Sequence, residues 1–165
     1  MGTAEPDLLP GYAEWLARIT ATVDAVSYTC GVRLGDRAAG DAVAARVAVG
    51  LVSRPTVFRH WGLPYSGRIA KLAEDAIADV RAGRLVGGST WGSFRQALVT
   101  VPPDHQSTLV LACVEGYDAD QLAMTWRCDV ATARDRRTRT LTHMKELAAA
   151  HGAAGDVGPE EGWGP

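Results

Sequence analysis

The chain has 165 residues, of which 47% are hydrophobic, and this length allows one ordinary domain or two small ones with a real core. A formal net charge of −2 argues against a protein whose whole surface follows nucleic acid, and three cysteines at wide spacings predict neither a disulfide framework nor a zinc site. The sequence shows no secretory leader pattern and no run of eighteen apolar residues, so we expect a cytoplasmic protein with no membrane partner.

The first half of the chain predicts three helices. Small and turn-forming residues over 1–11 indicate a flexible leader. Apolar residues then recur every three or four positions over 12–34, which is typical of an amphipathic helix. An aspartate after a glycine is expected to cap a second helix over 36–51, and helical spacing returns over 65–83 after a loop with two large aromatic residues. Together these helices form an expected domain over 12–83.

The second half predicts a linker and then a helical domain over 103–150. Glycine, serine and proline residues over 84–102 indicate a flexible segment. Three aspartates then precede apolar stretches and are expected to cap three helices, of which the last runs over 130–150. Residues 151–165, rich in glycine and acids, are expected to be disordered. Because no strand-like alternation persists, we predict an all-α chain of two small helical domains.

Basic residues concentrate near the end of the chain. Between positions 127 and 145, six basic residues stand against two acidic ones, a local balance of 6 − 2 = +4 in an otherwise acidic chain. The basic residues are Arg127, Arg134, Arg136, Arg137, Arg139 and Lys145, and the acidic ones are Asp129 and Asp135. Arginine suits contacts with phosphate and guanine. A solvated helix surface carries such charges equally well, so the pattern alone leaves both interpretations open.

The segment after Pro103 shows a fixed order of features. A helical stretch ends at a Glu-Gly pair, and an acid-led helix start and a Thr-led helix start follow. The two helix starts read Asp120-Gln121-Leu122-Ala123 and Thr132-Ala133-Arg134-Asp135-Arg136. This order resembles the fourth conserved region of sigma factors, in which a helix-turn-helix places its second helix in the DNA major groove.

The resemblance implies double-stranded promoter DNA as a partner. On a helix that starts near Asp129, the side chains of Thr132, Arg136 and Arg139 share one face, as contact with a groove requires. The DNA-binding residues that we expect are Arg127, Thr132, Arg134, Arg136, Arg137, Arg139 and Lys145. Asp135 lies within this surface and would repel phosphate if it faced the DNA backbone.

Two motifs of the first half, Leu34-Gly35-Asp36 and Ala39-Gly40-Asp41, resemble the second conserved region of extracytoplasmic-function (ECF) sigma factors. In that family a Gln-Glu pair on the following helix binds RNA polymerase, and Ala44 and Ala45 stand at these positions here. The resemblance implies that Asp41, Ala44 and Ala45 bind the polymerase core. It also implies an anti-sigma or other regulatory protein as a further partner.

Three aromatic residues, Phe58, Trp61 and Tyr65, precede a helix that resembles the promoter-reading helix of the same family. Such side chains can stack on the unpaired bases of melted DNA. Aromatic residues beside an irregular loop also commonly fill a small core. From Ile69 to Arg81 the helix carries two bases and three acids, a balance of 2 − 3 = −1 that would hold DNA poorly.

The sequence therefore predicts a DNA-binding transcription factor that resembles an ECF sigma factor and directs RNA polymerase to specific promoters. The two alanines at the polymerase-binding positions favour a second hypothesis, a degenerate sigma-like protein. Such a protein acts as an accessory DNA-binding regulator or protein-interaction module without promoter opening. An enzyme is a third class, but the sequence contains no HExxH, phosphate-binding glycine loop or GxSxG motif. We therefore expect no catalytic residue, cofactor or metal.

Overall fold

The computed structural model describes residues 7–59, 63–85 and 90–152, and within these ranges every regular element is helical. The prediction of an all-α chain is therefore confirmed. The elements are α1 (Pro10–Leu34), α2 (Arg37–Val52), the 3-10 helix η1 (Pro55–Arg59), α3 (Leu63–Arg81), α4 (Trp91–Val99), α5 (Pro103–Leu109), the π-helix η2 (Val110–Val114), α6 (Ala119–Trp126) and α7 (Val130–Ala150). Among the described residues, no helix combines the length and the apolar character needed to cross a membrane.

The first two helices form a tight antiparallel pair. Gly35 ends α1 in the left-handed conformation with φ 68°, which glycine adopts without steric cost, and the Asp36 carboxylate accepts a hydrogen bond from the Ala38 amide to start α2. The helix backbones nearly touch where Gly40 faces Gly31, because a Cβ placed on Gly40 would lie 2.6 Å from the Gly31 Cα. A side chain at Gly40 would therefore prevent this close crossing, whereas a Cβ at Gly31 would find no atom closer than 3.7 Å.

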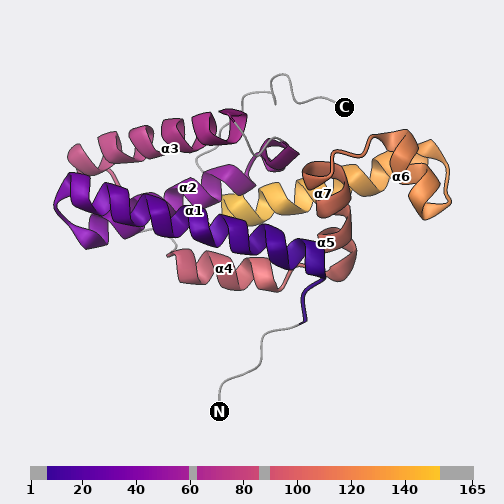
Figure 1. The fold of residues 1–165 in the computed structure, drawn as a ribbon, viewed down its shortest axis with the longest axis horizontal. Helices are drawn as coiled ribbons and strands as arrows, with labels where there is room; N and C mark the ends of the chain where they lie inside the picture. Colours follow the sequence, from indigo (N-terminus) through magenta and orange to yellow (C-terminus); the bar gives the residue numbers. More distant parts are fainter. Residues whose placement is uncertain (1–6, 60–62, 86–89, 153–165) are drawn as a thin grey trace, which may run out of the picture.

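Helix α2 lies at the centre of the molecule and contacts α1, α3, α4 and α7 (Figure 1). From Val43 to Val52 every residue except Arg46 is buried. A helix that is covered on all sides must be apolar around its whole circumference, which explains the small apolar residues of α2.

The expected flexible linker over 84–102 is wrong where α4 forms. The Thr90 hydroxyl caps α4 by accepting a hydrogen bond from the Ser93 amide, and Phe94 and Leu98 are fully buried. The Leu98 carbonyl accepts a hydrogen bond of 2.6 Å from the Tyr12 phenol, which ties α4 to the start of α1. Residues 86–89 of the expected linker lie outside the described residues.

One continuous cluster of buried apolar side chains runs from α1 to α7, so the expected domains over 12–83 and 103–150 share a core in this structure. The C-terminal turns of α7 bury Met144 and Ala148, and the His151 ring packs 5.1 Å from the Phe94 ring. The expected leader is ordered from Asp7, since the Leu9 amide donates a 3.0 Å hydrogen bond to the Gln106 side chain. Residues 1–6 and 153–165 lie outside the described residues.

Candidate nucleic-acid interface

Helices α6 and α7 are joined by only three residues, 127–129. The Asp118 carboxylate accepts a hydrogen bond from the Gln121 amide, the Gln121 side chain accepts one from the Asp118 amide, and both distances are 2.8 Å. The Asp129 carboxylate then caps α7 by accepting a 2.7 Å hydrogen bond from the Thr132 amide. Hydrogen bonds with Thr132 hold the pKa of the Asp129 carboxyl below its usual value, against the smaller opposing effect of burial. Both helix starts are therefore fixed by the caps that the sequence predicts.

The turn between the two helices depends on Arg127. This residue has φ 55°, a left-handed conformation that costs a side-chain-bearing residue about 1–2 kcal/mol. Its amide donates to the carbonyls of Ala123 and Met124, which ends α6, while its side chain is exposed. The Arg127 side chain therefore projects into solvent at the point where the chain turns from one helix to the next.

Packing holds α6, α7 and α5 together. Leu122 of α6 and Ala133 of α7 are fully buried in the common core. The His105 ring of α5 lies 2.6 Å from the Thr140 hydroxyl of α7, measured from Nδ1, and stacks on the His143 ring with the centroids 4.6 Å apart. The inner side of α7 is therefore anchored, and its outer side remains available.

A defined row of polar residues lies on α7 between its buried stripe and its fully exposed side. At 100° per residue, Thr132, Arg136, Arg139 and His143 fall within one narrow arc of the helix. We call these four residues the α7 row. Thr132 and Arg139 are exposed, whereas Arg136 and His143 are half-buried. Thr132, Arg136 and Arg139, which we expected to share one face of the helix, do share one face.

Two arginines of the α7 row have partners within the chain. The Arg136 guanidinium lies 3.9 Å from the centre of the Trp126 ring, a cation–π contact across the turn. Arg139 forms an ion pair of 3.0 Å with Asp135, and both side chains are 65% exposed. An exposed pair of this kind is weak, so Arg139 can exchange Asp135 for a phosphate at small cost.

The remaining expected DNA-binding residues are spread around α7. Arg134 and Lys145 are exposed on the flank that lies away from the α7 row, and Arg137 is half-buried on the side of the core. Asp135 lies opposite the buried stripe and therefore at the centre of the exposed surface. The structure thus brings Thr132, Arg136 and Arg139 together and leaves the other basic residues of α7 outside that row.

Sequence reasoning missed the two contacts that organise this surface. Trp126 and Arg136 are ten positions apart and meet only because the chain turns at Arg127. His105 and His143 come from different helices, and no spacing rule relates them. The only sequence signal for the first contact was a tryptophan just before the predicted turn and an arginine in the helix after it.

The histidine stack makes the packing of α5 on α7 sensitive to pH. Burial lowers the pKa of His105, and the neighbouring His143 and Arg139 lower it further against the opposing effect of Asp104. The unfolded chain then binds a proton more readily than the folded chain, so stability is lost as the pH falls through the ordinary histidine value of about 6.5.

Replacing His105 with glutamine is expected to reduce this pH dependence. Urea unfolding of the wild type should give a lower free energy of unfolding at pH 5 than at pH 7.5, and the difference should be smaller in the variant because one titrating group is gone. The hydrogen bond to Thr140 affects both pH values alike, so the difference is the informative quantity. An equal difference in both proteins would contradict a role for His105.

The aromatic residues expected to stack on bases are part of the core. Phe58 is fully buried, packs edge to face on Trp15 at 5.2 Å and lies 6.1 Å from Tyr65. Tyr65 is also buried, with its phenol 2.7 Å from the Thr22 hydroxyl. The expectation that Phe58 and Tyr65 bind bases does not fit this structure, because both side chains are buried, as the alternative of filling a small core requires. Trp61 lies outside the described residues.

The positions expected to bind polymerase are also mostly covered. Asp41 is exposed on α2 and accepts a hydrogen bond from the Ser27 hydroxyl. Ala44 and Ala45 are buried on α2, the helix that α1, α3, α4 and α7 all contact. The expectation that both alanines present a surface to polymerase is therefore wrong for this arrangement of the helices.

The described residues offer no group of three or more histidine, cysteine or acidic side chains that could hold a metal ion. Cys30, Cys113 and Cys128 are free thiols, and burial raises the pKa of Cys30. No family model matches the chain, and no curated protein or solved structure matches it either. What the chain does is therefore inferred from its own side chains and their geometry.

Proposed function

We propose that this chain is a DNA-binding transcription factor similar to ECF sigma factors, in which α6 and α7 act as a helix-turn-helix. The observation that carries the proposal is the three-residue turn into α7, followed by Thr132, Arg136 and Arg139 along one face of that helix. Helix α6 and the first turns of α7 lie at one end of the molecule, away from α3 and α4 (Figure 1). A DNA duplex can approach this end without displacing another helix.

Each residue of the surface has a role that follows from its position. Thr132 lies in the first turn of α7, the part of a recognition helix that reaches base edges. Arg139 offers a planar guanidinium for guanine or phosphate, and Trp126 holds Arg136 in a fixed orientation before DNA arrives. Arg127, exposed in the turn before α7, suits a phosphate contact.

Asp135 is the one acidic group at the centre of this surface, and Asp135→Asn is expected to strengthen DNA binding. Removing a negative charge near phosphate and releasing Arg139 together amount to about 1 kcal/mol, which corresponds to about a fivefold gain in affinity. Fluorescence anisotropy with a labelled duplex at fixed salt measures the change. Glu146→Gln, on the same face farther along α7, is the matched control and should change affinity less. Equal gains in both variants would mean that only net charge matters.

A second candidate function, an accessory DNA-binding regulator without promoter opening, is favoured by the first half of the chain. Ala44 and Ala45 are buried rather than presented to a polymerase core, and Phe58 and Tyr65 are held in the core rather than beside melted bases. Promoter initiation requires the helices to rearrange, whereas duplex binding by α7 does not. DNA recognition is thus the part of the proposal that the present arrangement supports best.

Selection of duplexes from a random library with the full chain, followed by run-off transcription, tests both candidates. We expect the selection to enrich a defined duplex sequence, which then binds more tightly than a scrambled duplex of equal length. Specific transcripts with purified polymerase core would support initiation and contradict the accessory function. Duplex binding without transcripts or core binding would support the accessory function. Failure to enrich any sequence would contradict the proposal as a whole.

A further inference from the structure

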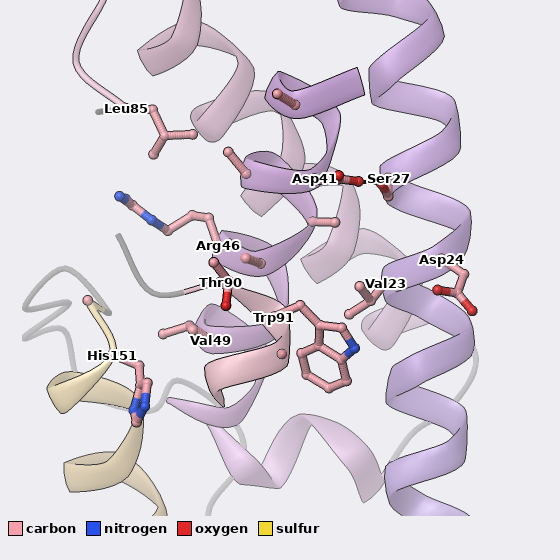
Figure 2. Close-up of a pocket in the computed structure, with 16 residues that line it drawn as sticks. Val23, Asp24, Ser27, Asp41, Arg46, Val49, Leu85, Thr90, Trp91 and His151 are labelled. Atoms are coloured by element: carbon pink, nitrogen blue, oxygen red, sulfur yellow. Dashed lines mark hydrogen bonds between the residues drawn. The ribbon is translucent and has the colours of Figure 1, made fainter. Parts of the chain in front are cut away.

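A cavity of about 630 Å³ lies between α1, α2, the start of α4 and the end of α7 (Figure 2). Its described walls come from residues within 23–27 and 38–49, from Leu85, from 90–92 and from 151–152. Cavities that bind small molecules in proteins measure about 300–1,000 Å³. This cavity therefore has the size of a small-molecule site and unites both halves of the chain.

The wall of the cavity is largely apolar. Ala44, Ala45 and Val49 line it from α2, and Leu85 lines it from the segment after α3. The indole of Trp91 stands between α2 and α1 and presents a broad aromatic surface in the middle of the view (Figure 2). Of the apolar lining residues, Ala42 is exposed and Leu85 and Trp91 are half-buried, so a flat apolar molecule could replace water against these three and gain the free energy of burying apolar surface.

The charged residues of the cavity lie at opposite sides. Arg46 extends from α2 on the side of Leu85, and Asp24 and Asp41 lie on the side of α1 (Figure 2). Asp41 already accepts a hydrogen bond from Ser27. Arg46 is half-buried, and within the described part of the chain no carboxylate forms an ion pair with it. A half-buried arginine that no described carboxylate neutralises, beside an apolar cavity, suits an anionic group of a bound molecule.

We infer that this cavity binds a small molecule with a planar apolar body and one anionic group. The body lies against Trp91, Leu85 and Ala42, and the anion meets Arg46. The two aspartates on the α1 side disfavour a second anion there. Because both halves of the chain form the walls, the molecule binds only when they are packed together and stabilises that arrangement. The inference does not depend on DNA binding.

The test uses 1-anilinonaphthalene-8-sulfonate as an anionic probe and N-phenyl-1-naphthylamine as its neutral counterpart, each titrated into the full chain. We expect saturable binding of one sulfonate probe per chain. Arg46→Gln should weaken the sulfonate probe by about tenfold or more and leave the neutral probe unchanged, since a charged hydrogen bond is lost. Arg46→Lys should restore most of the affinity. Arg37→Gln, an exposed arginine on the same helix that does not line the cavity, is the matched control.

A second pair of variants tests the location without changing charge. Gly92 lines the cavity, and the nearest atom to a Cβ placed there is 3.8 Å away, so a larger side chain causes no backbone clash. Gly92→Leu should weaken both probes, whereas Gly92→Ala should not. Equal sulfonate binding by wild type and Arg46→Gln, an equal loss in Arg37→Gln, or non-saturating binding to exposed apolar surface would each overturn the inference. Cooperative thermal unfolding of every variant shows that the fold is retained.

Discussion

Replacing Arg136 and Arg139 together with alanine is expected to weaken DNA binding by at least about thirtyfold. Each side chain is placed for a base or phosphate contact, and such a contact contributes about 1–3 kcal/mol. If both contacts are with phosphates, the slope of log affinity against log salt should also fall by nearly 2, because each one releases about 0.9 counterion. Anisotropy titrations of a selected duplex at several salt concentrations measure both effects.

The control for this double variant must lose the same charge elsewhere. Arg37→Ala with Arg81→Ala removes two exposed arginines from α2 and α3, far from α7 in the chain. We expect the control to bind DNA within about threefold of the wild type, because long-range charge effects are screened beyond about 10 Å. Arg136→Lys keeps the charge but not the planar stacking on Trp126, and should lose less than Arg136→Ala. An unchanged affinity and salt slope in the double variant would contradict the placement of the DNA surface.

Replacing Gly40 with alanine is expected to lower the free energy of unfolding by about 1–3 kcal/mol, the usual cost of overpacking. The added Cβ would lie 2.6 Å from the Gly31 Cα and amide nitrogen and from the Ser27 carbonyl oxygen. All three atoms belong to the backbone of α1, so the helices must move apart. Alanine favours a helix over glycine by about 1 kcal/mol, and the clash must outweigh that gain.

Gly67→Ala in α3 is the matched control for the clash. Gly67 is exposed, and a Cβ placed there would meet no atom within 4 Å. This variant should gain about 0.5–1 kcal/mol from helix propensity alone. Urea unfolding of both variants measures the two changes, and stabilisation in both would contradict the close crossing of α1 and α2.

Local patterns in the sequence predict most of the individual helices. The apolar spacing over 12–34 and 65–83 matches α1 and α3 closely, and the aspartates at 36, 118 and 129 cap the helices that they precede. These features depend on residues within a few positions of one another, which is why periodicity and capping rules find them.

Helix α4 was not predicted because the residues on either side of it are typical of a loop. Glycines before Trp91 and prolines after Val99 indicate a loop, and nine residues between them are too few for a clear periodicity. Phe94 and Leu98 sit four apart, as an amphipathic helix requires, yet their burial depends on α1 and α2. Packing with distant parts of the chain therefore decides this element.

The candidate site likewise has features that the sequence predicts and features that it does not. That Thr132, Arg136 and Arg139 share one face follows from helix geometry and was predictable. The Asp135–Arg139 pair, four positions apart on one helix, was predictable in the same way. That Trp126 holds Arg136 and that Ala44 and Ala45 are covered follow only from how the helices pack. Burial of Ala44, Ala45 and Phe58 depends on helices that are distant in the sequence, so local patterns do not reveal it.

The most direct test of DNA recognition by α7 is a chemical-shift titration of the ¹⁵N-labelled full chain with a selected duplex. The proposal predicts that backbone amides over 127–143 shift on binding, most of all near Thr132 and Arg139, while amides of α3 change little. Shifts in α3 with no change over 127–143 would contradict it.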